Sequence, residues 1–146
     1  YPEERQRWWS DYSGLAPTAV EEIVRWASPV AYMRRTATAD IEMGGVKIAA
    51  GDKVSLWYGS ANRDESKFAD PWRFDVSRHP NPHVGFGGGG AHFCLGANLA
   101  RREITVAFEE LHRLVPDIQA TAEPDLLHSA FIHGIKRLPV TWTPPV

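Results

Sequence analysis

Apolar residues recur at helical spacing in two stretches of the chain. In the first stretch, residues 18–28, the apolar positions Val20, Ile23, Val24 and Ala27 share one face. In the second stretch, residues 97–115, an apolar stripe lies opposite a row of charged residues. That stripe consists of Leu99, Ala100, Ile104, Ala107, Phe108, Leu111 and Val115. The pattern therefore predicts two main helices, each with one buried face.

Start and stop signals set the expected ends of the first helix. Thr18 and Glu21 form a capping box, which predicts a helix start at residue 18. The helix should stop before Ser28-Pro29, because the residue before a proline avoids helical conformation. A short charged helix is also expected over residues 1–14, ending in a turn at Ser13-Gly14.

Elsewhere the period changes to that of strands. Extended segments are expected at residues 30–33, 41–43, 46–48 and 54–58, with glycine-containing turns between them. These segments predict a small antiparallel sheet. Residues 126–143 are expected to form a hairpin, and the tail 144–146 to be mobile. The predicted fold class is mainly α with small antiparallel β-sheets.

Residues 59–84 have little periodicity and are rich in turn formers and aromatic residues. A structureless stretch of this length in a compact domain is usually functional or disordered. Phe68, Trp72 and Phe74 argue against disorder, because disordered segments contain few aromatic residues. We therefore expect an ordered, irregular meander.

Composition narrows the classes of function. The chain has 146 residues, enough for one modest domain, and a net charge of -2, which gives no reason to expect nucleic acid binding. No apolar run approaches the length of a membrane span. The single cysteine excludes an internal disulfide and suits a reducing compartment, so a cytoplasmic location is expected. The N-terminus lacks an initiator Met and a signal-peptide core, so we expect a fragment or a processed product.

That cysteine, Cys94, belongs to the most distinctive stretch of the chain, residues 85–96. The glycines at 87–90 precede it, and the second predicted helix follows it. Glycine loses the most backbone entropy on ordering, so such a run indicates a sharp turn or a close approach to a ligand. The thiolate form of cysteine binds metals and attacks electrophiles, and a helix N-terminus favours that form. Cys94 is therefore a candidate metal ligand or nucleophile.

The loop by itself leaves several interpretations open. The simplest is a glycine-rich turn with a buried, inert cysteine. A phosphate-binding loop is a weak match, because no strand precedes Gly85-x-Gly87-x-x-Gly90. A cysteine phosphatase needs a shorter spacing than the six residues that separate Cys94 from Arg101. The remaining interpretation is a thiolate ligand of heme iron.

Landmarks in the rest of the chain support the heme interpretation. They follow one another as Glu22-x-x-Arg25, Arg35-Thr36-Ala37-Thr38, Asn62-Arg63-Asp64, Pro71-x-Arg73-Phe74 and His92-x-Cys94-Leu95-Gly96. In this order they resemble the C-terminal part of a cytochrome P-450 of the soluble bacterial type, over essentially all 146 residues. Glu-x-x-Arg alone has almost no specificity, whereas the whole set is highly specific. The resemblance extends to the actinobacterial branch that hydroxylates terminal methyl groups of methyl-branched lipids and sterols.

The resemblance implies a cofactor and the residues that bind it. Cys94 would be the proximal thiolate ligand of the iron in heme b (iron protoporphyrin IX). A thiolate ligand donates electron density that favours cleavage of the O–O bond. Arg35 and His92 match positions that hold the heme propionates, and Phe86 and Gly96 match positions of the heme-binding loop.

The resemblance also implies structural and substrate-facing roles. From the pattern alone, Glu22 and Arg25 would be an exposed ion pair. The resemblance instead places them with Arg73 in a buried triad that ties the first helix to the meander. Basic residues around Arg101 and Arg102 are expected either to face an electron donor or to be solvated. Six residues match segments that line the substrate pocket: Val30, Ala31, Tyr32, Met33, Phe131 and Ile132.

The implied activity is that of a heme-thiolate monooxygenase, an iron-dependent oxidoreductase. Such an enzyme would insert one oxygen atom from dioxygen into a C–H bond of a hydrophobic small molecule, a lipid or sterol. Its electrons would come from a ferredoxin-type partner. No catalytic residue beyond the Cys94 ligand is expected in this chain. The alternative is a non-catalytic, truncated fragment that binds heme or docks an electron donor.

Two departures from the family pattern affect these expectations. Eight positions lead from Phe86 to Cys94, one more than is usual in the family. Either a bulge absorbs the extra residue, or Phe86 packs differently from usual. The chain also resembles only the final third or so of the family's catalytic domain, without the long oxygen-binding helix and its acid–alcohol pair. We therefore expect the chain alone to be unable to complete oxygen activation.

Overall fold

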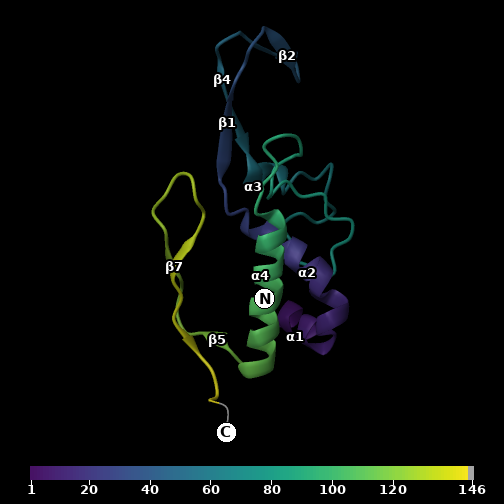
Figure 1. The fold of residues 1–146 in the computed structure, drawn as a ribbon, viewed down its shortest axis with the longest axis vertical. Helices are drawn as coiled ribbons and strands as arrows, with labels where there is room; N and C mark the ends of the chain where they lie inside the picture. Colours follow the sequence, from purple (N-terminus) through teal and green to yellow (C-terminus); the bar gives the residue numbers. More distant parts are fainter. Residues whose placement is uncertain (145–146) are drawn as a thin grey trace.

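Three helices form the centre of the structure, a computed structural model that describes residues 1–144. They are α1 (Pro2–Ser10), α2 (Tyr12–Ala27) and α4 (Ala97–Leu114), while α3 (Tyr58–Ala61) is a single turn. Two β segments extend from these helices and are called the β excursions below. The first, residues 32–57, lies at the top of Figure 1, and the second, residues 119–141, lies at the left. The fold is mainly helical with small antiparallel sheets, as predicted. The last two residues of the tail predicted to be mobile lie outside the described residues.

α2 begins earlier than predicted. It starts at Tyr12 rather than Thr18, so Ser13-Gly14 lie inside the helix and form no turn. The chain breaks instead at Asp11, whose carboxylate accepts the Gly14 N–H at 3.1 Å and caps the helix. The Thr18 hydroxyl donates to the carbonyl of Val76 at 2.7 Å, so the predicted capping box does not form. The predicted end of the helix is confirmed, because α2 stops at the residue before Ser28.

The apolar core lies where α1, α2 and α4 meet. Trp8 is only 3% exposed, and its ring packs on Tyr12 and on Phe108 of α4. The small residues Ala16 and Ala19 are buried in the same cluster. Burial of a large apolar side chain contributes about 1.5–3 kcal/mol. This packing fixes α4, and with it the backbone that follows Cys94. Among residues 1–144, none of the helices has the combined length and apolar character needed to cross a membrane.

The first β excursion consists of two separate ladders, whereas one small sheet was predicted. The antiparallel pairs are β1 (Tyr32–Thr36) with β4 (Lys53–Trp57), and β2 (Ile41–Met43) with β3 (Val46–Ile48). Gly44 and Gly45 connect β2 to β3 with φ of 56° and 81°, which glycine adopts without strain. β4 is followed directly by α3, where the irregular stretch of residues 59–84 begins. The β1–β4 ladder is therefore joined to that stretch (Figure 1).

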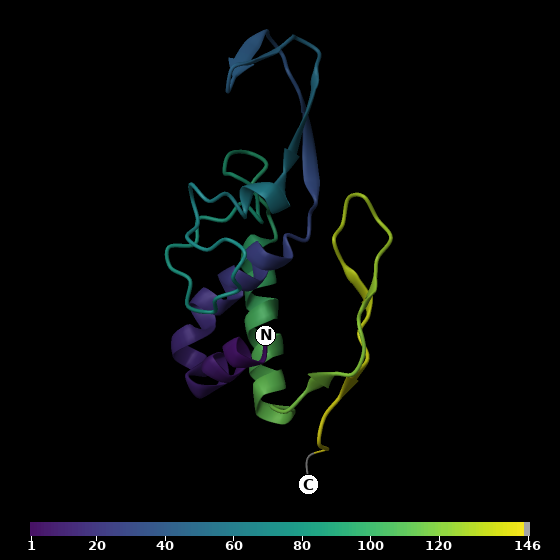
Figure 2. The same ribbon diagram turned by 180° about the vertical axis from the view of Figure 1, so that it is seen from behind.

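The second β excursion is the C-terminal hairpin, which begins earlier than residue 126. Its antiparallel pairs are β5 (Gln119–Ala120) with β8 (Val140–Thr141), and β6 (Asp125–Leu126) with β7 (Ile135–Arg137). Figures 1 and 2 show from opposite sides that its stem stands apart from α4. Beyond β6, Val30 and Ile132 form an isolated antiparallel bridge that joins the hairpin tip to the segment before β1.

Candidate functional site

The cysteine loop, residues 85–96, is closed by its own backbone. The Cys94 N–H donates to the Phe86 carbonyl at 2.9 Å, and the Cys94 carbonyl accepts the Ala97 N–H at 3.2 Å. Three glycines of the run have φ between 78° and 95°, which side chains with a Cβ rarely adopt: Gly87, Gly89 and Gly90. The run therefore lets the chain fold back and places Cys94 directly before α4.

The extra residue between Phe86 and Cys94 fits into the glycine run. A Cβ at Gly88, Gly89 or Gly90 would meet no atom within 4 Å, so this part of the loop protrudes into open space. The hydrogen bond from Cys94 to Phe86 still closes the loop. The arrangement favours the first of the two explanations, a bulge that absorbs the extra residue.

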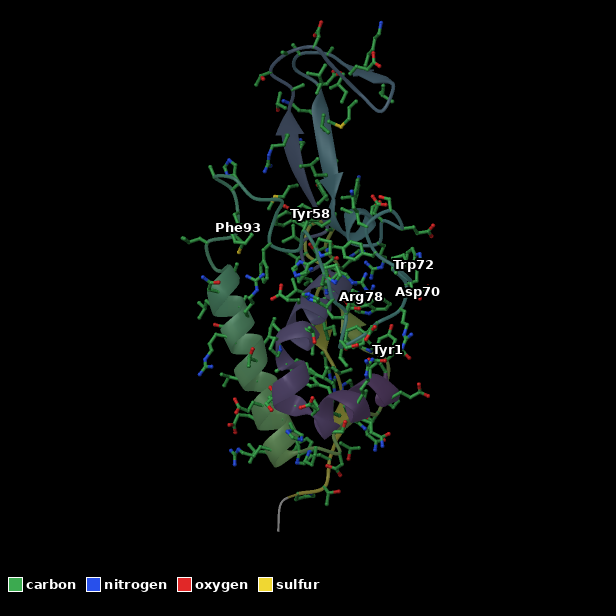
Figure 3. The ribbon with its side chains drawn as sticks, turned by 90° about the vertical axis from the view of Figure 1, so that its right-hand side faces the viewer. Tyr1, Tyr58, Asp70, Trp72, Arg78 and Phe93 are labelled. Carbon is green, nitrogen blue, oxygen red and sulfur yellow. The ribbon has the colours of Figure 1, made fainter. Side chains whose placement is uncertain are left out.

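The Cys94 side chain is exposed, together with apolar side chains that flank it in sequence. Phe93 is 46%, Leu95 104% and Leu99 63% exposed. Figure 3 shows Phe93 beyond the upper end of α4, away from the helix pack. Gly96 lies beside the sulfur, since a Cβ built there would be 3.9 Å from Cys94 Sγ. An exposed apolar patch around a thiol is suited to a large apolar ligand that covers both.

Arg35 and His92 lie at one cavity, although they are far apart in sequence. The cavity lies between the β1–β4 ladder and the glycine run, and Trp57, Tyr58 and Gly87 are part of its lining. Both basic side chains are exposed. Two basic groups that converge on one cavity are suited to a carboxylate or another anion.

The thiol and the basic cavity together fit an amphipathic planar ligand. Cys94 lies among apolar side chains, while His92, two residues earlier on the same loop, faces the basic cavity with Arg35. A heme combines an apolar ring around iron with carboxylates at one edge, so these residues fit the predicted cofactor. Within residues 1–144, no three His, Cys, Asp or Glu side chains gather into a separate metal site.

The predicted buried triad has a different third member. Glu22 and Arg25 are fully buried and joined by hydrogen bonds of 2.7 and 2.8 Å. The third side chain is Arg78, which is 9% exposed and whose Nε lies 3.1 Å from Glu22. The prediction of Arg73 is wrong, because its side chain is 61% exposed and lies 3.8 Å from Glu4. The Arg73 carbonyl instead points into the cluster and accepts from Arg25 and Arg78.

This buried cluster organises the meander and the entry to the cysteine loop. Arg25 donates to the carbonyls of Asn62 and Pro71 at 2.7 and 2.9 Å. Asn62 is fully buried, donates to the Ser28 hydroxyl and accepts the Val84 N–H at 2.8 Å. In Figure 3 Arg78 lies toward the centre of the molecule, whereas Trp72 lies at its edge. α2 thus anchors the backbone directly before the cysteine loop through contacts that no local pattern reveals.

The predicted pocket residues come from two segments that the fold joins. The Ala31 N–H donates to the Phe131 carbonyl at 2.9 Å, and Val30 pairs with Ile132. The rings of Tyr32 and Phe131 meet edge to face with centroids 6.4 Å apart. The hairpin tip and the start of β1 therefore form one surface, and its role toward a substrate stays a prediction.

The Phe86 ring lies close to Arg101 and His83, and Glu21 links these two side chains. The Arg101 guanidinium carbon lies 4.5 Å from the centroid of the Phe86 ring, and the His83 ring lies 5.9 Å away. Both of these side chains bond to Glu21 of α2. The hydrogen bond from Arg101 is the main reason that the pKa of the Glu21 carboxyl lies below its ordinary value. The sequence gives no local signal for the contacts of Glu21 with His83 and Arg101, because three segments that are distant in sequence bring these side chains together.

Known proteins resemble this chain over nearly its whole length. A family model described as Cytochrome P450 matches residues 15–126. The methyl-branched lipid omega-hydroxylase of Mycobacterium tuberculosis is 78% identical over 143 residues, which cover 98% of this chain and 33% of that protein. The steroid C26-monooxygenase of Mycolicibacterium smegmatis is 48% identical over 136 residues, which cover 92% of this chain and 32% of that protein.

Solved structures show the same likeness. A Mycobacterium marinum cytochrome P450 in complex with pseudoionone matches with a TM-score of 0.93 and 51% identity, covering 97% of this chain and 34% of the other. The chain spans about a third of the length of the curated relatives that it matches.

Proposed function

The chain belongs to the cytochrome P450 family, and we propose that the protein containing it is a heme-thiolate monooxygenase. It inserts one oxygen atom from dioxygen into a C–H bond of a hydrophobic substrate, and its cofactor is heme b. The observation that carries this proposal is the exposed Cys94 thiol at the start of α4, on the same loop that brings His92 to Arg35. Membership of this family leaves no support for the cysteine phosphatase interpretation.

Methyl-branched lipids are the proposed substrate class, with sterols second. The relative named for a methyl-branched lipid is 78% identical to this chain, and the one named for a steroid is 48% identical. Titration of the full-length, heme-loaded protein with a methyl-branched fatty acid and with a sterol separates the two classes. We expect a shift of the heme absorption at lower concentrations of the branched lipid, and tighter binding of the sterol would reverse this order.

The chain's own residues hold and orient the cofactor. The Cys94 sulfur ligates the iron, and the hydrogen bond to Phe86 fixes the Cys94 backbone. The N-terminus of α4, which is the positive end of the helix dipole, follows directly. Arg35 and His92 hold the carboxylates at the edge of the ring. A thiolate-ligated heme supplies the dioxygen chemistry when it is bound.

A ferredoxin-type protein is the proposed electron donor, and the cytoplasm is the proposed location. The family needs a redox partner, and a single cysteine suits a reducing compartment. Arg102 is exposed on α4 and suits an acidic partner, whereas the Arg101 guanidinium is bonded to Glu21. Changing Arg102 to Glu should weaken donor binding most at low salt, since contacts between exposed charges are screened by ions.

The deciding experiment is the spectrum of the full-length, heme-loaded protein after reduction and exposure to carbon monoxide. The wild type should show the strongly red-shifted Soret band of thiolate ligation. Cys94→Ala and Cys94→Ser should lose this band, and their heme content separates loss of the ligand from loss of the fold. A red-shifted band in both variants, or no heme uptake by the wild type, would overturn the proposal.

A truncated module that binds heme or docks a donor is the second candidate for the chain itself. The observation that favours it is the exposure of Leu95 and Leu99, which leaves an apolar surface beside Cys94 that a bound heme would cover. We expect the isolated chain to hydroxylate no substrate, since its residues serve the thiolate side of the cofactor. Turnover by the isolated chain with a competent electron donor would contradict this expectation.

A further inference from the structure

We infer that Glu21, His83 and Arg101 clamp the ring of Phe86 and thereby position Cys94 for iron ligation. This inference rests on the proposed function of Cys94. The three side chains, called the Phe86 clamp below, come from α2, from the end of the meander and from α4. They therefore tie the start of the cysteine loop to both main helices.

Glu21 fixes the orientation of the Arg101 guanidinium. Arg101 Nε donates to one carboxylate oxygen at 2.5 Å, and Nη2 donates to the other at 2.9 Å. Such a two-point contact sets the plane of the guanidinium as well as its position. Only 28% of the Glu21 side chain and 33% of the Arg101 side chain are exposed, so solvent screens the contact less than on an open surface.

The fixed guanidinium holds the aromatic ring of Phe86. Its central carbon lies 4.5 Å from the ring centroid, within the range in which a cation is attracted by an aromatic face. The His83 ring also lies close to Phe86, with the ring centroids 5.9 Å apart and the two planes tilted by 55°. Phe86 is thus confined by two side chains that are themselves bonded to the same carboxylate.

His83 also acts on the loop backbone. Its Nδ1 accepts the Gly85 N–H at 3.1 Å, so the ring proton lies on Nε2, which donates to Glu21 at 2.8 Å. The His83 side chain is 3% exposed, so both bonds are shielded from water. The clamp therefore fixes the backbone at Gly85 and the side chain at Phe86, the first two residues of the loop.

The clamp reaches Cys94 through one hydrogen bond. The Phe86 carbonyl accepts the Cys94 N–H at 2.9 Å, across the protruding glycines. A Phe86 that moves will shift this carbonyl and, with it, the backbone that carries the sulfur. Arg101 is accordingly a positioning residue, and this role replaces its expected role as a donor-facing or solvated residue.

The test uses the full-length, heme-loaded protein and two readouts. Arg101→Gln and Glu21→Gln remove the charges of the clamp with little change in size. Arg113→Gln is the control, an exposed arginine on the same helix that also pairs with a glutamate, Glu110. The first readout is the fraction of the reduced carbon monoxide complex that has the red-shifted band. The second is the hydrogen exchange rate of the peptide that carries the Cys94 amide.

We expect both clamp variants to give a mixture of red-shifted and ordinary bands. Their Cys94 peptide should exchange roughly tenfold faster, as loss of a charge-assisted hydrogen bond implies. The control should match the wild type in both readouts. Arg101→Lys should be intermediate, because lysine keeps the ion pair with Glu21 but has no planar group to lie over Phe86.

Other outcomes overturn the inference in distinguishable ways. A lower unfolding midpoint with an unchanged band and unchanged exchange would mean a purely structural role for the clamp. If Arg101→Gln does not fold, Arg101→Lys decides, and an unchanged band in Arg101→Lys would then overturn the inference. In all of these cases Cys94→Ala still removes the band. If Cys94→Ala keeps the band, the proposed function itself has failed.

Discussion

The chain's two main sequence motifs lie in two regions, the buried cluster of Glu22, Arg25 and Arg78 and the cysteine loop. The two regions differ in which side-chain polar groups lack a partner. All five N–H donors of Arg25 have an acceptor within the chain, and Glu22 is fully buried. In the cysteine loop the backbone is bonded while the thiol of Cys94 is exposed. A buried cluster built on a fully paired arginine stabilises the fold, whereas a fixed backbone with an open side chain is prepared for a ligand.

Substitution of Arg25 should cause the largest loss in the free energy of unfolding. Arg25→Ala removes the main partner of a fully buried carboxylate and leaves several carbonyls without donors. Breaking such a network should lower the free energy of unfolding by about 3–5 kcal/mol. Urea unfolding measures this loss, with Arg34→Ala on the exposed face of β1 as the matched control. A loss no larger than that of the control would mean that the cluster is open to solvent.

The second prediction distinguishes Arg78 from Arg73. Arg78→Ala removes charge-assisted hydrogen bonds to Glu22 and should cost about 1.5–3 kcal/mol. Arg73→Ala should change the free energy of unfolding by no more than about 0.5 kcal/mol, since its side chain is mostly in solvent. The two variants are compared by the same urea titration. The reverse order would restore Arg73 as the third member of the triad.

The third prediction concerns the start of the cysteine loop. A Cβ at Gly85 would lie 2.6 Å from Val24 Cγ1, so Gly85→Ala must push the loop away from α2. Overpacking of this kind typically costs about 1–3 kcal/mol. Val24→Ala should remove part of the clash, so the double variant should lose less than the sum of the single variants. Strict additivity of the two losses would show that the loop does not rest on α2 at this point.

The smallest predicted effect is the dependence of the free energy of unfolding on pH. The bond from Arg101 holds the pKa of Glu21 below its ordinary value of 4.5. The ionised carboxylate therefore stabilises the fold fully above about pH 4.5, and this stabilisation is lost as the pH falls through the lower pKa of the folded state. Glu21→Gln should remove this part of the acid sensitivity. The measurement is the free energy of unfolding of the wild type and of Glu21→Gln, at neutral pH and in steps below pH 4.5. The two free energies should converge in acid. Parallel curves would contradict the assignment.

Local patterns were sufficient to locate the cysteine loop in the chain. Its glycines, Cys94 and the start of α4 are neighbours in sequence, and the hydrogen bonds that close it span only a few residues. Their conformation depends on backbone preferences that each residue carries with it. The sequence therefore predicted the position of Cys94 correctly, whereas its role as a ligand stays a prediction from resemblance.

Local patterns failed where the deciding partner is distant. Thr18 looked like a helix cap, but its hydroxyl bonds to Val76. Arg73 and Arg78 lie in the same irregular stretch, and only the folded path decides which side chain turns inward. Glu21 belongs to a predicted helix without any sign that it would bond to Arg101. In each case a contact between distant segments overrides or completes the local signal.

The tip of the C-terminal hairpin is attached to the segment before β1 mainly through main-chain groups. The Ala31 N–H bonds to the Phe131 carbonyl, and the His133 N–H bonds to the Pro29 carbonyl. Nearly every residue type supplies the same main-chain groups, so side chains at the tip can be exchanged without detaching it. Over evolutionary time, duplicated genes can therefore diverge at positions such as 131 while the attachment is inherited unchanged.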